Sequence, residues 1–251
     1  MERTILITND DGIRAEGLMT LEKSLAPLGR VVTVAPEIEQ SATSHAITLD
    51  RPLRIKEYGN GRYSVSGTPT DCVLLAVHRI LDSPPDLVVS GINHGPNMGE
   101  DVTYSGTVAA AIEAYILGID AMAVSVTAWE PDSFSPAGEI ARYLAGKVLA
   151  SRRERAYLWN VNIPPLPADQ ILGVRITKLG SRIYNDTIVR KTDPRGKDYF
   201  WIGGGEPGWN RDDSSDFSAV SAGYVSVTPL KLDMTDSETM SELQGWDLQW
   251  P

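Results

Sequence analysis

Two adjacent acidic residues directly follow an apolar run near the N-terminus, in the sequence NDDG. Asp10 and Asp11 repel each other, so a cation held between them would offset an electrostatic cost that the pair otherwise carries. Carboxylate oxygens are the ligands that Mg²⁺, Mn²⁺ and Ca²⁺ prefer. Neighbouring side chains of a strand point to opposite faces, so the two carboxylates converge only if the chain turns, which Gly12 permits. The motif therefore predicts a divalent-cation site.

Two more polar loops follow apolar runs, PEIEQSATSH at residues 36–45 and GINHGPNMGEDVTYSGT at residues 91–107. In open parallel α/β sheets, ligands bind beyond the carboxyl ends of the strands, where these loops would meet the acid pair. Ser41 and either Asn93 or Asn97 would add neutral oxygen ligands to the cation. The alternative is that one aspartate caps the following helix while the other is solvated.

The tripeptide Ser105-Gly106-Thr107 opens an alanine-rich helical pattern. Free N–H groups at a helix start, with two hydroxyls, form a cradle for an anion such as phosphate, although an ordinary Ser/Thr cap explains the same residues. A cation beside such a cradle indicates phosphoryl chemistry. The sequence has no G-x-x-x-x-G-K-[ST] loop and no G-x-G-x-x-G near the first strand, which disfavours that type of NTP hydrolysis and dinucleotide binding.

The chain has three histidines. His45 lies in the same loop as Ser41, where it could donate a proton to a leaving alkoxide or orient a phosphate. His78 falls within an apolar helical pattern and is expected to be structural. His94 adjoins Asn93 and is expected to line the rim of the site.

Composition narrows the classes of function. The chain has 251 residues and a formal net charge of −10, which disfavours non-specific binding to nucleic acid or to anionic membranes. Its one cysteine, Cys72, excludes an intramolecular disulfide and a cysteine metal cluster, and an apolar helical context predicts that this thiol is buried. No run of about 18 apolar residues and no secretory-type N-terminus is present, so we expect a soluble, cytoplasmic protein.

Strand-like and helix-like patterns alternate over the first two thirds of the chain. The near-continuous Val, Ile and Leu content of the strands is typical of buried parallel strands, and the alternation indicates βαβ crossovers. We predict a mostly parallel sheet with helices on both faces. Strands are expected at residues 4–8, 31–35, 86–92, 120–126 and 156–164, helices at 17–28, 69–81, 105–118 and 136–151, and short β segments at 47–49, 53–55 and 63–65.

The pattern changes after residue 167. Residues 184–209 are rich in Gly, Asp and aromatic side chains, which is typical either of a long hairpin that contacts another subunit or of a surface insertion. We predict a single domain over residues 1–251, with an excursion for subunit contacts at about 180–218 and an amphipathic tail at 231–251.

Five motifs in this order resemble the SurE family of survival-protein nucleotidases: NDDG, APEIEQSATSHAIT, GTPTDCV, SGINHGPNMGEDVTYSGTVAAAIEA and GYVSVTPL. The resemblance runs from residue 5 to about residue 230. It implies a Rossmann-like three-layer α/β/α fold, with a protruding hairpin and a C-terminal segment that exchange between subunits of a homodimer or homotetramer. It also implies a metal-dependent phosphatase of nucleoside 5′- and 3′-monophosphates.

Matching the motifs position by position assigns roles to named residues. The family's ligands to one divalent cation, most simply Mg²⁺ or Mn²⁺, fall on Asp10, Asp11, Ser41 and Asn93. Asn97 matches a position that faces the substrate. The family's phosphate-binding turn falls on Ser105, Gly106 and Thr107, and Tyr104 stands where some relatives have histidine.

Three hypotheses follow. The first is attack by metal-activated water on a nucleoside monophosphate, with Asp10, Asp11 and Asn93 as catalytic residues and either aspartate as general base. The second is an aspartyl nucleophile of the haloacid-dehalogenase type, which is disfavoured because Asn9 would occupy the nucleophile position. The third is a nucleotide-binding regulatory module without turnover.

Overall fold

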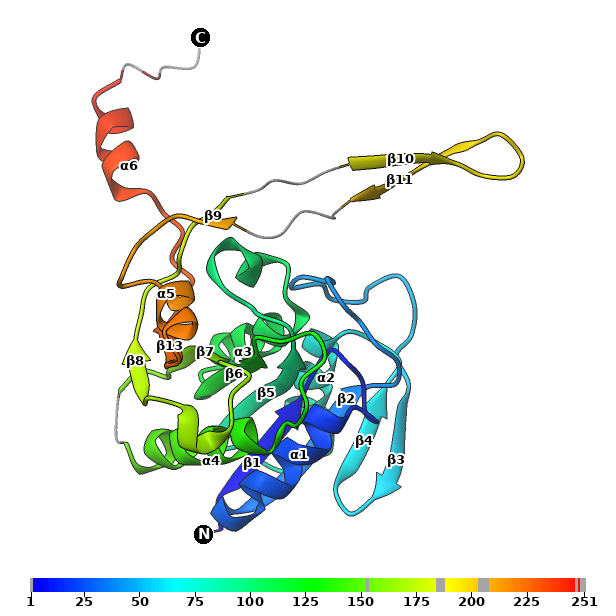
Figure 1. Ribbon diagram of the computed structural model, residues 1–251. Helices are drawn as coiled ribbons and strands as arrows, with labels where there is room; N and C mark the ends of the chain where they lie inside the picture. Colours follow the sequence, from blue (N-terminus) through cyan, green and yellow to red (C-terminus); the bar gives the residue numbers. More distant parts are fainter. Residues whose placement is uncertain (1, 152–153, 184–187, 203–207, 247, 249–251) are drawn as a thin grey trace.

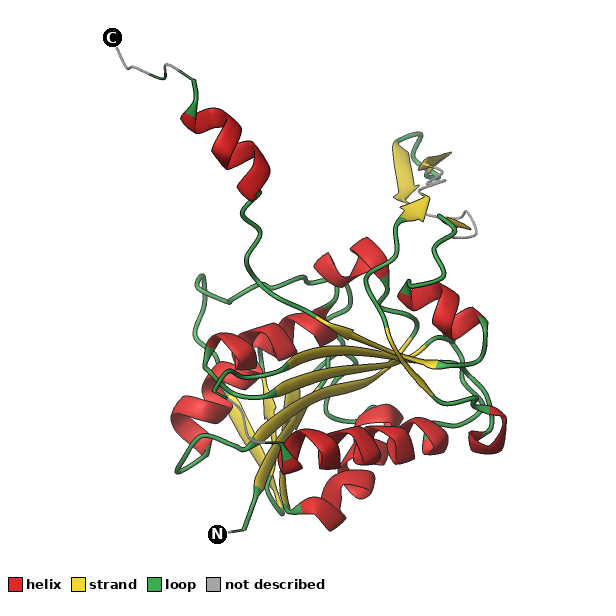
Figure 2. Cartoon of the chain, turned by 90° about the vertical axis from the view of Figure 1, so that its left-hand side faces the viewer, coloured by secondary structure: helices red, strands yellow, loops and turns green. Residues whose placement is uncertain are grey.

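The computed structural model describes residues 2–151, 154–183, 188–202, 208–246 and 248. Within these residues the core is a nine-stranded sheet with helices on both faces (Figure 1, Figure 2). The strands pair in the order β3 (Ile55–Gly59), β4 (Arg62–Val65), β2 (Arg30–Pro36), β1 (Thr4–Thr8), β5 (Leu87–His94), β6 (Ala121–Val126), β7 (Leu158–Ile163), β13 (Val225–Pro229) and β8 (Val174–Ile176).

The middle of the sheet is parallel, as predicted. From β4 through β2, β1, β5 and β6 to β7, each strand pairs in parallel with its neighbour. Within the described residues of this nine-stranded sheet, β3 on β4 and β13 on β7 are the antiparallel pairs. All six central strands therefore direct their carboxyl ends to the same edge, which brings the loops that follow β1, β2 and β5 together.

Helices cover the two faces in pairs. On one face, α1 and α4 pack over an apolar cluster that includes Ile5, Ile7 and Leu21. On the other face, α2 and α3 pack over a cluster that includes Leu6 and Val34. Figure 2 shows these helices as two layers with the sheet between them. The helices are α1 (Glu16–Leu25), α2 (Pro69–Leu75), α3 (Gly106–Ile116), α4 (Ser135–Ala150), α5 (Asp216–Ser221) and α6 (Ser237–Gln244).

Two predictions about local elements need correction. Residues 47–49 form no strand, because Thr48 instead gives its N–H and its hydroxyl to Asp71 at 3.0 and 2.6 Å. The helix predicted at 69–81 continues beyond α2 as a π-helical turn at Ala76–Ile80, and His78 on that turn is exposed rather than packed in the core. Cys72 is fully buried in α2, as expected.

The excursion near the C-terminus projects from the body of the molecule (Figure 1). Strands β9 (Arg182–Ile183) and β12 (Gly208–Trp209) pair at its base, and β10 (Ile188–Thr192) and β11 (Asp198–Ile202) form an antiparallel hairpin beyond them. Helix α6 extends separately from the body. None of the described helices combines the length and the apolar character needed to cross a bilayer.

Candidate functional site

The acid pair lies on a tight turn at the carboxyl end of β1. The side chain of Asn9 accepts a hydrogen bond from the Gly12 N–H and donates one to the Gly12 carbonyl, both at 3.1 Å. Gly12 has a φ of +98°, a conformation that favours glycine over other residues. The Ile13 N–H then donates to the Pro36 carbonyl at the end of β2. The turn predicted from NDDG is therefore present, and Asn9 is committed to holding it.

Asp10 is nearly inaccessible, with 6% of its surface exposed. The Thr107 hydroxyl, at the start of α3, donates a hydrogen bond to Asp10 Oδ1 at 2.5 Å. Burial raises the pKa of the Asp10 carboxyl above its ordinary value, although the bond from Thr107 lowers it. The carboxylate is thus held at the helix start in a position where its charge is poorly solvated.

Asp11 is the second buried acid and contacts His94 at the end of β5. Asp11 Oδ1 and His94 Nε2 are 2.9 Å apart, and the Asp11 side chain is 9% exposed. Burial raises the pKa of Asp11, and the neighbouring charge of Asp10 raises it further. Neither aspartate caps the next helix, because the N-cap of α1 is Ala15 with no side-chain bond. The capping alternative is therefore wrong.

The loop after β2 is hydrogen-bonded to the acid turn. The Gln40 N–H donates to the Asp10 carbonyl at 2.7 Å, and the Ser44 N–H donates to the Tyr104 carbonyl at 3.1 Å. Ser41 follows Gln40 in the chain, and its role as a cation ligand stays a prediction. Its hydroxyl, however, is exposed and donates to Glu39 at 2.6 Å. Ser41 would have to exchange that partner in order to bind a cation.

The far end of the same loop is fixed to α3 and α2. His45 Nε2 lies 2.7 Å from Oε2 of Glu113, a buried residue of α3. The Thr68 hydroxyl donates to the Ala46 carbonyl at 2.7 Å. The sequence assigned His45 to proton donation or phosphate orientation, whereas the structure pairs it with Glu113. We therefore interpret His45 as a residue that positions the loop.

The start of α3 lies directly against Asp10. The Ser105 hydroxyl accepts the Val108 N–H at 3.1 Å, so it is an ordinary helix cap, which was the alternative kept open for this residue. Thr107 uses its hydroxyl on Asp10. A Cβ added to Gly106 would lie 2.9 Å from the Cβ of Asp10, too close for any side chain. An anion at this helix start would therefore meet first-turn N–H groups and the Ser105 hydroxyl, whose proton is not used by the cap, but not the Thr107 hydroxyl.

The loop after β5 is fixed from below by a buried polar layer. The Asn97 N–H donates to Asn162 Oδ1, and its carbonyl accepts bonds from the side chains of Asn160 and Asn162 at 2.7 and 2.9 Å. Asn97 Nδ2 donates to the Ser125 hydroxyl at 2.8 Å. Asn93 donates its amide N–H to the Gly95 carbonyl at 2.9 Å, which leaves its amide oxygen as the atom that could face a cation.

Sequence reasoning missed four contributors to this site. His94 was placed on the rim, yet it is the direct partner of Asp11. Glu113 was not considered, because one acid in an alanine-rich helix gives little signal. Asn160 and Asn162 did carry a signal, since two amides at alternate positions of an apolar strand point to the same face and need buried partners.

The donors at this edge fit a hard divalent cation. The carboxylates of Asp10 and Asp11 are largely removed from water and have raised pKa values, and His94 contacts Asp11, so a positive charge between the acids would relieve both burial and repulsion. The described residues contain no group of three or more His, Cys, Asp or Glu side chains arranged for a metal. The predicted set of two acids with neutral Ser41 and Asn93 oxygens suits Mg²⁺ or Mn²⁺ better than zinc.

Together, the doubly wound sheet and the strand-end acids beside a helix start define an α/β protein of the phosphate-handling kind. The family model "Survival protein SurE" matches residues 5–186, and the chain belongs to this family. It is 49% identical over 245 residues to 5′-nucleotidase SurE of Geobacter sulfurreducens, covering 97% of this chain and 94% of that protein. It is 48% identical over 243 residues to the protein of the same name from Pelobacter propionicus, covering 96% and 98%.

A solved structure of the same family supports the fold. The SurE protein from Aquifex aeolicus matches with a TM-score of 0.87 and 42% identity, covering 96% of this chain and 98% of that one. The three-layer arrangement with a mostly parallel sheet is therefore shared with that protein. The likeness extends across nearly the whole of both chains.

The raised pKa values predict how pH affects stability in a chelator. Folding raises both carboxyl pKa values, so stability from these groups is present at low pH and is lost as pH rises above about 3.8, the ordinary value. We expect Asp11→Asn to raise the Tm of EDTA-treated protein at about pH 8, by ~2–4 °C for each ~1 kcal/mol gained. The gain should vanish below the ordinary carboxyl pKa. Differential scanning calorimetry at both pH values measures it.

Asp82→Asn is the matched control, because Asp82 is exposed and should show no such gain. Added Mn²⁺ should reverse the order, since a cation that binds only the folded wild type stabilises it by mass action. A lower Tm for Asp11→Asn in EDTA at about pH 8 would contradict the assignment of an uncompensated acid pair.

Proposed function

We propose that this chain is a metal-dependent phosphomonoesterase that hydrolyses nucleoside 5′-monophosphates, and also 3′-monophosphates, to a nucleoside and phosphate. The observation that carries the proposal is the contact of Asp10 with the start of α3, because a cation held by the acid pair would then lie beside N–H groups suited to an anion. The relatives named 5′-nucleotidase match this chain over nearly their full length. That extent makes a shared activity the simplest expectation.

Asp10, Asp11, Ser41 and Asn93 would hold one Mg²⁺ or Mn²⁺ per subunit. When bound, such a cation polarises phosphoryl oxygens and lowers the pKa of water near it. It would also provide the local positive charge that an anionic substrate needs on a protein of net charge −10.

The remaining roles belong to the chain itself. First-turn N–H groups of α3 would hydrogen-bond the phosphoryl oxygens, and the Asn97 loop would close the site from the side of β5. In hydrolysis, a water oxygen bonds to phosphorus while the ester P–O bond breaks, and the alkoxide of the nucleoside takes up a proton. Asp11 or Asp10 would accept the proton of the attacking water, for which a raised carboxyl pKa is suited.

The two alternative hypotheses, an aspartyl nucleophile and a regulatory module, require different properties of the same residues. An aspartyl nucleophile would need a carboxylate at position 9, but Asn9 has an amide that is bonded twice to Gly12. A regulatory module would bind the nucleotide in the same place without turnover. Only an activity measurement separates that module from an enzyme.

Phosphate release from AMP tests the proposal. The purified full-length protein should release inorganic phosphate from AMP when Mg²⁺ or Mn²⁺ is added, and EDTA should stop the release. Asp10→Asn should lower kcat/KM by at least ~100-fold, because it removes a charged ligand where even outer-shell changes cost 10–100-fold. Asp82→Asn, an exposed acid, is the control.

The possible outcomes separate the hypotheses. Tight AMP binding by calorimetry without phosphate release under any divalent cation would favour the regulatory module. A phosphorylated aspartate trapped from the reaction would favour the covalent mechanism. A screen of nucleoside 5′- and 3′-monophosphates against sugar phosphates would then establish the preferred substrate.

Gly106→Ala tests whether the helix start must touch the acids. The new Cβ would meet Asp10 at 2.9 Å and the Thr43 hydroxyl at 3.2 Å, so α3 and the acid turn would have to move apart. We expect kcat/KM for AMP to fall ~10–100-fold, the cost of small misplacements at a reacting centre. Gly146→Ala, where the nearest atom is a Leu28 methyl at 3.9 Å, is the matched control and should keep its activity. Equal kcat/KM values for AMP in Gly106→Ala and Gly146→Ala would contradict the proposal that the start of α3 must lie against the acids.

We also propose that the chain forms a homodimer or homotetramer through its projecting segments. The hairpin exposes Phe200 and Trp201, with 59% and 63% of their surfaces accessible, and the C-terminal tail exposes Met240 and Trp246. Large apolar side chains gathered on segments that leave the body are costly in water unless another surface covers them. The resemblance to a family that exchanges these segments supports the same expectation.

Sedimentation velocity tests this assembly. The wild type should sediment as a dimer or larger at micromolar concentration, and the double variant Phe200→Glu with Trp201→Glu should shift toward the monomer because it places two charges in the contact. Tyr143→Ser, which changes an exposed aromatic residue on α4, is the control. A wild type that sediments as a monomer would contradict the proposal.

A further inference from the structure

Trp129 is an exposed aromatic ring next to the acid site. It lies in the loop between β6 and α4, and 72% of its surface is accessible. The indole meets the ring of His94 edge to face, with 6.4 Å between centroids and planes at 68°. His94 in turn lies 2.9 Å from Asp11. One imidazole ring therefore separates the indole from the acids.

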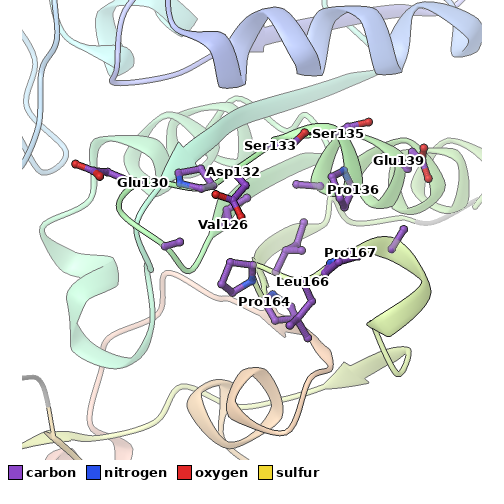
Figure 3. Close-up of a pocket in the computed structure, with 16 residues that line it drawn as sticks. Val126, Glu130, Asp132, Ser133, Ser135, Pro136, Glu139, Pro164, Leu166 and Pro167 are labelled. Carbon is purple, nitrogen blue, oxygen red and sulfur yellow. Dashed lines mark hydrogen bonds between the residues drawn. The ribbon is translucent and has the colours of Figure 1, made fainter.

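The backbone around Trp129 fixes which side of the loop its ring occupies. The Gly95 N–H donates to the carbonyls of Val126 and Ala128, at 2.9 and 2.8 Å. A Cβ on Gly95 would lie 2.7 Å from the indole, so the ring rests directly on this glycine. Ala128 and Glu130 line a separate cavity of about 650 Å³ beyond β6 and β7 (Figure 3), whereas Trp129 between them does not. The ring therefore faces the acid site and not the cavity.

We propose that Trp129 is the stacking surface for the nucleobase of the substrate, an inference that rests on the proposed function. Phosphate bound at α3 would leave the nucleoside to extend along the end of β5, over His94, toward the indole. A planar, exposed ring offers stacking to any base. Glu130 and Asp132 are close in sequence and make the loop acidic, so it suits the uncharged base and not the phosphate.

The structure favours this occupant over a second copy of the chain. The exposed apolar residues of the projecting segments already provide an assembly surface. Trp129 stands apart from them, in a loop of the body on the same sheet edge as the acid pair. A ring that contacts a residue of the acid site is better placed to meet substrate than to meet another subunit.

The test compares a substrate that carries a base with one that lacks it. For the wild type, Trp129→Ala, Trp129→Phe and the control Tyr143→Ala, kcat/KM is measured for AMP and for ribose 5-phosphate with Mn²⁺. We expect Trp129→Ala to lower the ratio of the two values about 5- to 100-fold, the range that loss of base stacking produces. Trp129→Phe, which keeps an aromatic face, should restore much of the ratio, and Tyr143→Ala should leave it unchanged.

Each other outcome has a separate meaning. An unchanged ratio in Trp129→Ala would overturn the stacking role while leaving the proposed function intact. An equal loss for both substrates would also overturn it, because the ring would then support the fold of the site. Dissociation of Trp129→Ala in sedimentation velocity would assign the ring to a subunit contact instead. A wild type that hydrolyses neither compound under any divalent cation would overturn the proposed function itself, and the stacking role with it.

Discussion

The repulsion between two neighbouring carboxylates held out of water is the constraint around which this sheet edge is organised. Asp10 and Asp11 are both buried, and burial raises the pKa of each. A fold does not retain such a pair for stability, since burial of charge destabilises the folded state unless it is fully compensated. The bond from Thr107 and the contact with His94 hold the two acids in place and oppose the rise in their pKa values without cancelling it. That combination is typical of a binding or catalytic site, where a charged group is preorganised at a cost in folding stability.

Each neighbouring element fixes the position or the orientation of one part of the acid pair. Asn9 and Gly12 set the turn, Thr107 orients Asp10, and His94 orients Asp11. The loop after β2 bonds to the same turn through the Gln40 N–H. Because α3 begins against Asp10 with no room for a side chain at position 106, the backbone amides of the helix start lie next to a proposed cation ligand. This proximity follows from the parallel topology, which gathers the ends of β1, β2 and β5 at one edge.

The sequence allowed the sheet and the acid turn to be predicted because both depend on local signals. Apolar runs, residues that end helices and the NDDG motif can each be recognised within a few residues of sequence. Contacts between segments that are far apart in the sequence were harder to predict. The pairing of His45 with Glu113 joins residues 68 apart, and nothing in the sequence indicated that the candidate proton donor would have this partner. The alternating side chains of residues 47–49 predicted a β segment. Instead, Thr48 hydrogen-bonds to Asp71, and no partner strand is present there among the described residues. In both cases a tertiary hydrogen bond overrode a local preference.

The two ends of the proposed site differ in their chemistry, and this difference bears on which substrates the site would select. At the end proposed to bind phosphate, Asp10 is held by the Thr107 hydroxyl and by the Gln40 N–H on its backbone carbonyl, and Asp11 contacts His94, so a substrate would have to present its charges in one place. At the Trp129 end, one exposed ring rests on Gly95 and meets the ring of His94 edge to face. Stacking on such a ring tolerates any base, whereas discrimination between bases needs buried polar partners for the base edge. The roles proposed for the two ends would therefore make recognition of the phosphomonoester stricter than recognition of the base.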